Sequence, residues 1–459
     1  MVDDEEIRFL DLKHLFCESA VSQLAVIPDL KTAHARREIM KAIILCENSY
    51  KVFFALKEAV TDYSRSCTIL DDSKSEFERA FAYIESVKSF YKVIESINGL
   101  FDAKLTVALK ESVDAFSSRS EFIYESVQRI ELKLKKIVSL TLRHSNAISS
   151  DPEGDFCLLI KNVCSALGYD VSSDNKRIVR VTSEFSDTVI NSFPELFHEI
   201  YLFQNETTDA VDRDILMIRG DLDFYLSIAD VFHSAREKAL PFCFPEESHV
   251  PKYQAESIID PYLINRVENI VSNNALFDGY SPIAYVMGAN GGGKTSILRA
   301  LASNLLLFLG GCPVFALKAE IYPFRFVRLF YPKEEHSFDT GRFDEEKKRI
   351  NRFVDEADDH TFAFFNEVFS GTTEPRAEIE LCELTHKLKS KGAFALFVTH
   401  FLNAETDLVT KLAVKVTADG ERTFKVVPAD EAISSYANDV LKKYRLDPES
   451  IGEERADDD

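Results

Sequence analysis

Hydrophobic positions in the first half of the chain recur with helical spacing and show almost no strand-like alternation. The clearest series alternates steps of four and three residues, a heptad pattern that predicts one long helix packed lengthwise against a partner. That series is Leu109, Val113, Phe116, Ser120, Ile123, Val127, Ile130, Leu134 and Ile137. Other helices are predicted at about 5–24, 30–62, 74–101, 155–168, 184–204 and 207–239, and 177–181 has the composition of a short strand.

The pattern changes near Leu240–Pro245, where two prolines bracket an apolar link. Beyond this point short apolar runs at 283–287, 361–365 and 393–398 alternate with helix-forming stretches. Strands that alternate with helices predict a mostly parallel sheet covered by helices. The expected fold is therefore a helical region followed by an α/β domain.

A phosphate-loop pattern, G-x-x-x-x-G-K-[S/T], connects the apolar run at 283–287 to a helix-forming stretch. Strand, glycine loop and helix is the order in which backbone N–H groups and a helix N-terminus bind phosphate. Lys294 would reach the β and γ phosphates, and the Thr295 hydroxyl would bind Mg²⁺. A glycine-rich turn that matches by chance is the alternative, and the flanking segments oppose it. The predicted residues that bind a nucleoside triphosphate are Gly288, Ala289, Asn290, Gly291, Gly292, Gly293, Lys294, Thr295 and Ser296.

Polar residues end the next two apolar runs. Asn366-Glu367 follows 361–365, and Thr399-His400 follows 393–398. Carboxyl ends of parallel strands form the ligand crevice of such sheets, so these side chains would face the phosphates. Glu367 is the predicted residue that polarises the attacking water, Asn366 would support Mg²⁺, and His400 would sense the γ phosphate. The alternatives are a polar strand end and a structural histidine.

Composition limits the functional classes. A net charge of −22 argues against a generally basic nucleic-acid binder, although a local basic patch remains compatible with it. Eight cysteines with no C-x-x-C pair read as reduced thiols. The acidic start has no apolar stretch of signal-peptide or membrane-span length, so a cytoplasmic protein without membrane contact is expected.

These motifs together resemble the ATPase domain of the MutS mismatch-repair family, a branch of the ABC ATPases. The likeness includes the phosphate loop, the stretch Asn366–Thr372 and the Val398-Thr399-His400 ending. It extends to Asn273-Asn274, Phe244-Pro245-Glu246, Thr340-Gly341-Arg342 and the segment from Ser434 to Tyr444, each similar to a family motif. The first half is similar by pattern more than by motif. Nothing in the chain resembles the family's N-terminal mismatch-recognition or connector domains.

The resemblance implies a helical core and lever domain at 1–244, a P-loop ATPase domain at 245–445 and an acidic tail at 446–459. It implies ATP and Mg²⁺ as cofactors. It also implies a dimer, expected to be a homodimer, in which Thr340 and Gly341 of one subunit contact the ATP of the other. Other repair proteins would be further partners.

Two departures from the family bear on activity. Asn366 replaces an Asp, which removes a charge that would support Mg²⁺ and is expected to slow hydrolysis. Phe343-Asp344-Glu345-Glu346 replaces small polar residues and a Phe. These carboxylates would repel a γ phosphate if they faced it; the favoured alternative places them in the first turn of a helix, where they complement its dipole.

DNA contact would come through the end of the heptad helix, where basic residues gather, although such a run is more often a solvated face. They are Lys133, Lys135, Lys136, Arg143 and His144. The leading prediction is a MutS-like ATPase that acts on DNA as a clamp or structure-specific binder. A nucleotide-gated protein scaffold with vestigial hydrolysis is the second prediction. A coiled-coil ATPase of the SMC type is third, because the helical segment precedes the ATPase region instead of splitting it.

Overall fold

The computed structural model describes residues 4–73, 76–98, 125–130, 132, 190–191, 194–207, 213–288, 291–331, 342–400, 409–417 and 422–429. The chain divides into two compact units, one formed by Met1–Leu45 with Asp223–Asp459 and the other by Cys46–Leu222. The first 45 residues therefore group with the sheet-containing part of the chain. The predicted division of the chain into domains at 1–244 and 245–445 and a tail at 446–459 stays a prediction.

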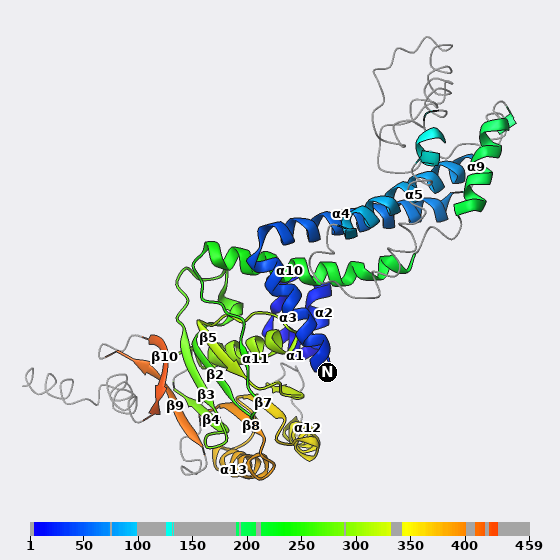
Figure 1. Ribbon diagram of the computed structural model, residues 1–459. Helices are drawn as coiled ribbons and strands as arrows, with labels where there is room; N and C mark the ends of the chain where they lie inside the picture. The colour runs from blue at the N-terminus through cyan, green and yellow to red at the C-terminus, as the bar shows by residue number, and fades with distance from the viewer. Residues whose placement is uncertain are drawn as a thin grey trace, which may run out of the picture. The chain divides into compact units, whose positions relative to one another are not determined.

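The unit of Cys46–Leu222 is helical in its described parts. Its helices are α4 (Glu47–Asp72), α5 (Glu76–Asn98) and α9 (Pro194–Thr207), with the start of α10 (Ile218–Glu237). α4 and α5 pack as an antiparallel pair (Figure 1), in which the ring centroids of Tyr63 and Phe90 lie 5.1 Å apart. The Tyr83 hydroxyl joins α5 to Thr207 of α9 at 2.6 Å. Of the predicted heptad helix, 125–130 and 132 are described and helical, while the remainder, 155–168 and 177–181 lie outside the described residues.

Two predicted helices are interrupted. In place of one helix at 5–24 the chain forms α1 (Asp4–Leu10), a short 3-10 turn at Leu12–His14 and α2 (Glu18–Ala25). Asp11 has a left-handed backbone with φ 47°, which ends α1. The helix predicted at 30–62 is broken between α3 (Leu30–Leu45) and α4 because Cys46 is extended, with ψ 110°. An extended residue cannot continue the i to i−4 hydrogen bonds of a helix.

The other unit contains a six-stranded, mostly parallel sheet with strand order β10-β9-β4-β8-β7-β6. Its strands are β4 (Ile283–Met287), β6 (Phe326–Phe330), β7 (Thr361–Asn366), β8 (Phe394–Val398), β9 (Thr410–Val416) and β10 (Arg422–Pro428). Among the pairings of these described strands, β9–β10 alone is antiparallel. This architecture is compatible with the predicted α/β ATPase domain. A smaller sheet, order β1-β5-β2-β3, contains β1 (Glu246–Glu247), β2 (Tyr253–Ile258), β3 (Asn273–Phe277) and β5 (Lys318–Ile321).

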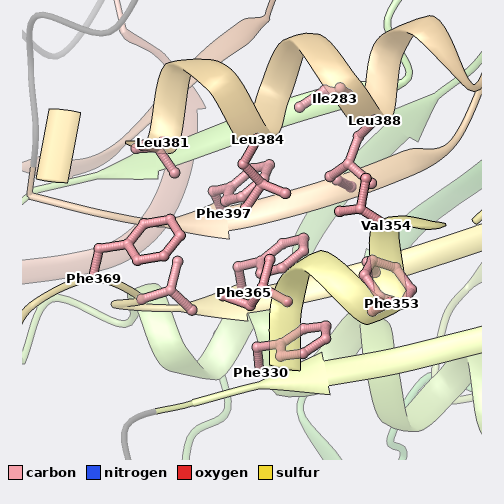
Figure 2. Close-up of a cluster of buried hydrophobic side chains, with 14 of the residues drawn as sticks. Ile283, Phe330, Phe353, Val354, Phe365, Phe369, Leu381, Leu384, Leu388 and Phe397 are labelled. Carbon is pink, nitrogen blue, oxygen red and sulfur yellow. The ribbon is translucent and has the colours of Figure 1, made fainter. Parts of the chain in front are cut away.

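Helices cover both faces of the large sheet (Figure 1). α11 (Lys294–Leu309) packs against β7 and β8 on one face, and α12 (Arg342–Glu356) and α13 (Glu374–Ser390) bury an aromatic core on the other. In that core Phe365 stacks between Phe330 and Phe397, with ring centroids 5.0 and 4.4 Å apart (Figure 2). The three residues are register partners on β6, β7 and β8, which explains the stacking. The core therefore fixes the strands whose ends carry the predicted site.

The helix α11 is fixed along its length as well as at its start. The guanidinium of Arg299 pairs with Asp260 at 3.0 Å and lies 3.8 Å above the ring of Tyr262. At the far end the chain turns at Gly311, whose φ of +82° suits glycine. A Cβ there would lie 2.5 Å from the carbonyl oxygen of Ala33, so α3 packs directly on this turn.

Among the described residues no helix is both long and apolar enough to cross a membrane.

Candidate nucleotide-binding site

The predicted phosphate loop connects the buried strand β4 to the N-terminus of α11. Gly288, Gly291 and Gly293 have φ of 135°, 74° and 103°, values that L side chains rarely adopt. Gly293 is the N-cap of α11, and its carbonyl accepts the N–H of Ile297 at 3.1 Å. The glycines thus allow the backbone to curl at the positive end of a helix, where an anion binds well. Ala289 and Asn290 lie outside the described residues.

Lys294 begins α11, and its side chain is turned back across the loop. Its Nζ donates to the carbonyl oxygen of Gly288 at 2.6 Å and lies 3.2 Å from Nδ1 of His400. The residue is only 4% exposed, and burial lowers the pKa of the ammonium while the charge of Glu367 opposes that shift. An ammonium already desolvated and held at the loop is placed to bind a phosphate oxygen.

Glu367 and His400 form a pair at the carboxyl ends of β7 and β8. Nε2 of His400 lies 2.9 Å from Oε1 of Glu367, and the Glu367 N–H donates to the Val398 carbonyl at 2.9 Å. Both side chains are partly accessible, with His400 42% and Glu367 32% exposed. The structure therefore brings together Lys294, Glu367 and His400, which are 106 residues apart at most in the sequence.

Thr295 and Asn366 supply the neutral oxygens next to this pair. Oγ1 of Thr295 and Oδ1 of Asn366 are 3.4 Å apart, and Asn366 is 9% exposed. Mg²⁺ accepts such oxygens together with waters and substrate phosphates. The two side chains fit that role, but with less charge than a carboxylate would give. No cluster of three or more His, Cys, Asp or Glu side chains suited to a metal occurs in the described parts of the chain.

The hairpin strand β10 borders the phosphate loop. This contact was not predicted from the sequence. Nη1 of Arg422 lies 3.4 Å from the carbonyl oxygen of Gly291. A Cβ at Gly293 would lie 3.4 Å from the ring of Phe424, whose own φ is 56°. Between Arg422 and Val426 the register of β10 with β9 shifts. Asn273, singled out above, holds this irregular segment, because it donates to the Phe424 carbonyl at 3.2 Å and accepts the Val426 N–H at 2.8 Å. No local sequence signal marks Arg422, because its place depends on the hairpin.

The structure describes some of the remaining predicted residues and leaves others outside the described ranges. Ser296 lies in the first turn of α11, and Gly292 lies within the loop. Asp344 and Glu345 occupy the first turn of α12, as favoured above. Glu346 points elsewhere: its Oε2 accepts the N–H of Phe369 at 3.2 Å. Thr340, Gly341, the basic cluster at 133–144, the segment 434–444 and the acidic tail lie outside the described residues.

Comparison with known proteins gives distant relatives along most of the chain. The endonuclease MutS2 of Streptococcus thermophilus is 24% identical over 368 residues, which cover 75% of this chain and 44% of the relative. MutS protein homolog 4 of Mus musculus is 22% identical over 447 residues, covering 88% of this chain and 44% of the relative. These similarities support a relationship with the MutS family. No family model matches the chain.

The relatives are much longer than the chain. It spans 44% of the length of the two proteins above and 48% of a MutS2 endonuclease from Streptococcus sanguinis, which is 22% identical. The relationship to the MutS family therefore covers a portion of those proteins. It agrees with the resemblance carried by the phosphate loop and the two strand ends.

Proposed function

We propose that the chain is a MutS-like protein that binds and hydrolyses ATP with Mg²⁺ and acts on DNA as an ATP-sandwich dimer. One observation carries the proposal: a glycine loop with a buried lysine lies beside a Glu–His pair at the carboxyl ends of parallel strands. The residues proposed to bind phosphate and to activate water lie within hydrogen-bonding distance of one another, which supports the proposal. The distant MutS-family relatives support the same chemistry.

Each side chain has a distinct role in this proposal. Lys294 and the loop N–H groups bind the β and γ phosphates. Glu367 orients a water and accepts its proton as the water oxygen bonds to the γ phosphorus and the bond to the ADP oxygen breaks. His400 holds the Glu367 carboxylate and would contact the γ phosphate. Bound Mg²⁺ neutralises phosphate charge, and Thr295 and Asn366 are the residues that would hold it.

The dimer and the DNA are proposed on sequence evidence. Thr340 and Gly341 would complete the ATP site of the partner subunit, as the resemblance implies. DNA would bind through the helical first half, where the basic cluster at 133–144 lies in the sequence. Mispair recognition is not part of this proposal, which rests on the residues of the ATP site.

A nucleotide-gated protein scaffold is the second candidate. Asn366 favours it, because an amide in place of a carboxylate gives Mg²⁺ weaker support. The overall charge of −22 also disfavours broad contact with DNA. In this case ATP would be bound, hydrolysed rarely, and used to change which protein partner is held.

Binding and hydrolysis of ATP by the purified chain test the proposal directly. We expect Mg²⁺-dependent binding of a fluorescent ATP analogue and steady-state release of phosphate. Lys294→Ala should abolish both, because the loop then lacks its cation, whereas Lys348→Ala removes an exposed lysine of α12 and should change neither. Undiminished analogue binding by Lys294→Ala would remove the phosphate-loop assignment. Binding without phosphate release would favour the scaffold.

A further inference from the structure

The turn that follows Glu367 has an unfavourable backbone. Glu367 and Phe369 have φ of 52° and 63°, in the left-handed region that non-glycine residues seldom occupy. Such conformations persist only where surrounding contacts impose them, and they concentrate at functional sites. The contacts that impose this one therefore also decide where the Glu367 carboxylate lies.

Two residues of α12, one turn apart, hold Phe369. The Glu346 carboxylate accepts the Phe369 N–H at 3.2 Å, and the ring of Phe343 lies 5.9 Å from the ring of Phe369. Phe343 and Phe369 are 8% and 2% exposed, and the guanidinium of Arg376 on α13 lies 4.5 Å above Phe343. Backbone and side chain of Phe369 are thus both anchored on the same helix.

The opposite side of the turn is held by β8. The N–H of Glu367 bonds to Val398 and its carboxylate to His400, as described above. The Glu346 contact is therefore the anchor that joins the backbone of the turn to α12, two residues after the proposed catalytic glutamate. Without an acceptor for the Phe369 N–H, the turn would relax towards ordinary φ values and carry Glu367 away from His400.

We propose that Glu346 is a positioning residue for ATP hydrolysis, which sets the geometry of Glu367 through the Phe369 backbone. This inference rests on the proposed function, since it assigns a residue to that reaction. Glu346 itself touches neither nucleotide nor water in this assignment. Its carboxylate is used for structure, which also accounts for an acidic residue close to a phosphate site.

The test compares Glu346→Ala, which removes the acceptor, with Glu346→Gln, which keeps an amide oxygen as an acceptor and removes the charge. Glu345→Ala is the matched control, because it removes an equal charge from the exposed face of the same helix. We expect Glu346→Ala to lower kcat by about tenfold or more, as a small misplacement of a reacting group does. The Kd of the ATP analogue should stay unchanged. Glu346→Gln should recover most of the activity, and Glu345→Ala should behave as wild type.

Amide hydrogen exchange of the peptide that contains Phe369 gives a readout independent of activity. Protection of this peptide should fall in Glu346→Ala and stay normal in Glu345→Ala. An unchanged kcat in Glu346→Ala, or an equal loss in Glu345→Ala, would overturn the positioning role. If the wild type hydrolyses no ATP, the proposed function fails by itself, and unchanged exchange in Glu346→Ala would then still refute the anchoring of the turn.

Discussion

Glu367 is held by Val398 through its backbone N–H and by His400 through its carboxylate, and this single residue gives the clearest prediction. Glu367→Gln keeps the size of the side chain and its bond to His400 but loses the base. We expect ATP-analogue binding to persist and single-turnover hydrolysis to slow by about a hundredfold to a thousandfold, the usual contribution of a positioned base. Glu356→Gln, at the exposed end of α12, is the control and should be neutral. Unchanged turnover in Glu367→Gln would mean that another residue orients the water.

Asn366 gives a prediction of the opposite sign. An aspartate there would place a carboxylate 3.4 Å from the Thr295 hydroxyl, where Mg²⁺ is expected, and would strengthen binding of the ion. Asn366→Asp should raise kcat by about tenfold, or about 1.4 kcal/mol of added transition-state stabilisation. Hydrolysis measured over a range of Mg²⁺ concentrations should also show a lower requirement. No change in either quantity would show that Mg²⁺ is held without this side chain.

Some residues of the site are marked by a short sequence motif, and others are brought to it by distant parts of the chain. Lys294, Thr295, Glu367 and His400 could be predicted, because a glycine loop or a buried strand end a few residues long marks each one. Arg422 and Glu346 could not, since their places follow from a hairpin and a helix that approach the site from other parts of the chain. The sequence gives no distinction between Asp344, Glu345 and Glu346. In the helix, Asp344 and Glu345 are exposed, whereas Glu346 accepts the Phe369 N–H.

At the scale of elements, the fully buried strands β4, β7 and β8 were predicted because each is a short apolar run followed by a glycine loop or by polar residues. The strands β6, β9 and β10 of the same sheet were not singled out. The small sheet was not predicted: β3 alternates between partly buried and exposed positions and includes two asparagines, which reads as a loop. The breaks at Asp11 and Cys46 also escaped prediction. Neither residue is a strong helix breaker, so tertiary packing decides both conformations.

The turn at the end of α11 provides a prediction about an element. Gly311→Ala would force a Cβ to within 2.5 Å of the Ala33 carbonyl and also penalise the positive φ. We expect a loss of about 2–4 kcal/mol in the free energy of unfolding, the sum of overpacking and left-handed strain. Gly279→Ala is the control, because nothing lies within 4 Å of its Cβ position. Denaturant melts of the two variants measure the difference, and equal midpoints would show that α3 yields without cost.

At the scale of the whole molecule, the negative net charge opposes binding to the proposed partner, DNA. The chain carries −22, yet its proposed partner is a polyanion. A basic cluster confined to one segment resolves this, because surface charges more than about 10 Å apart are screened at ordinary ionic strength. ATP binding at one site and a partner at the other would then be linked through differential affinity for two conformations. DNA binding, more than hydrolysis, separates the clamp from the scaffold.

The last prediction therefore concerns salt. If Lys133, Lys135, Lys136 and Arg143 each neutralise one phosphate, affinity for DNA should fall about a hundredfold between about 50 and about 200 mM salt. Fluorescence anisotropy with duplex, mismatched, branched and single-stranded DNA, using Glu367→Gln loaded with ATP, measures this slope. Replacing the three lysines of the cluster by glutamine should flatten the slope, whereas the same change at Lys348, Lys387 and Lys389 should not. ATP binding without affinity for any DNA form at low salt would leave the protein scaffold as the function.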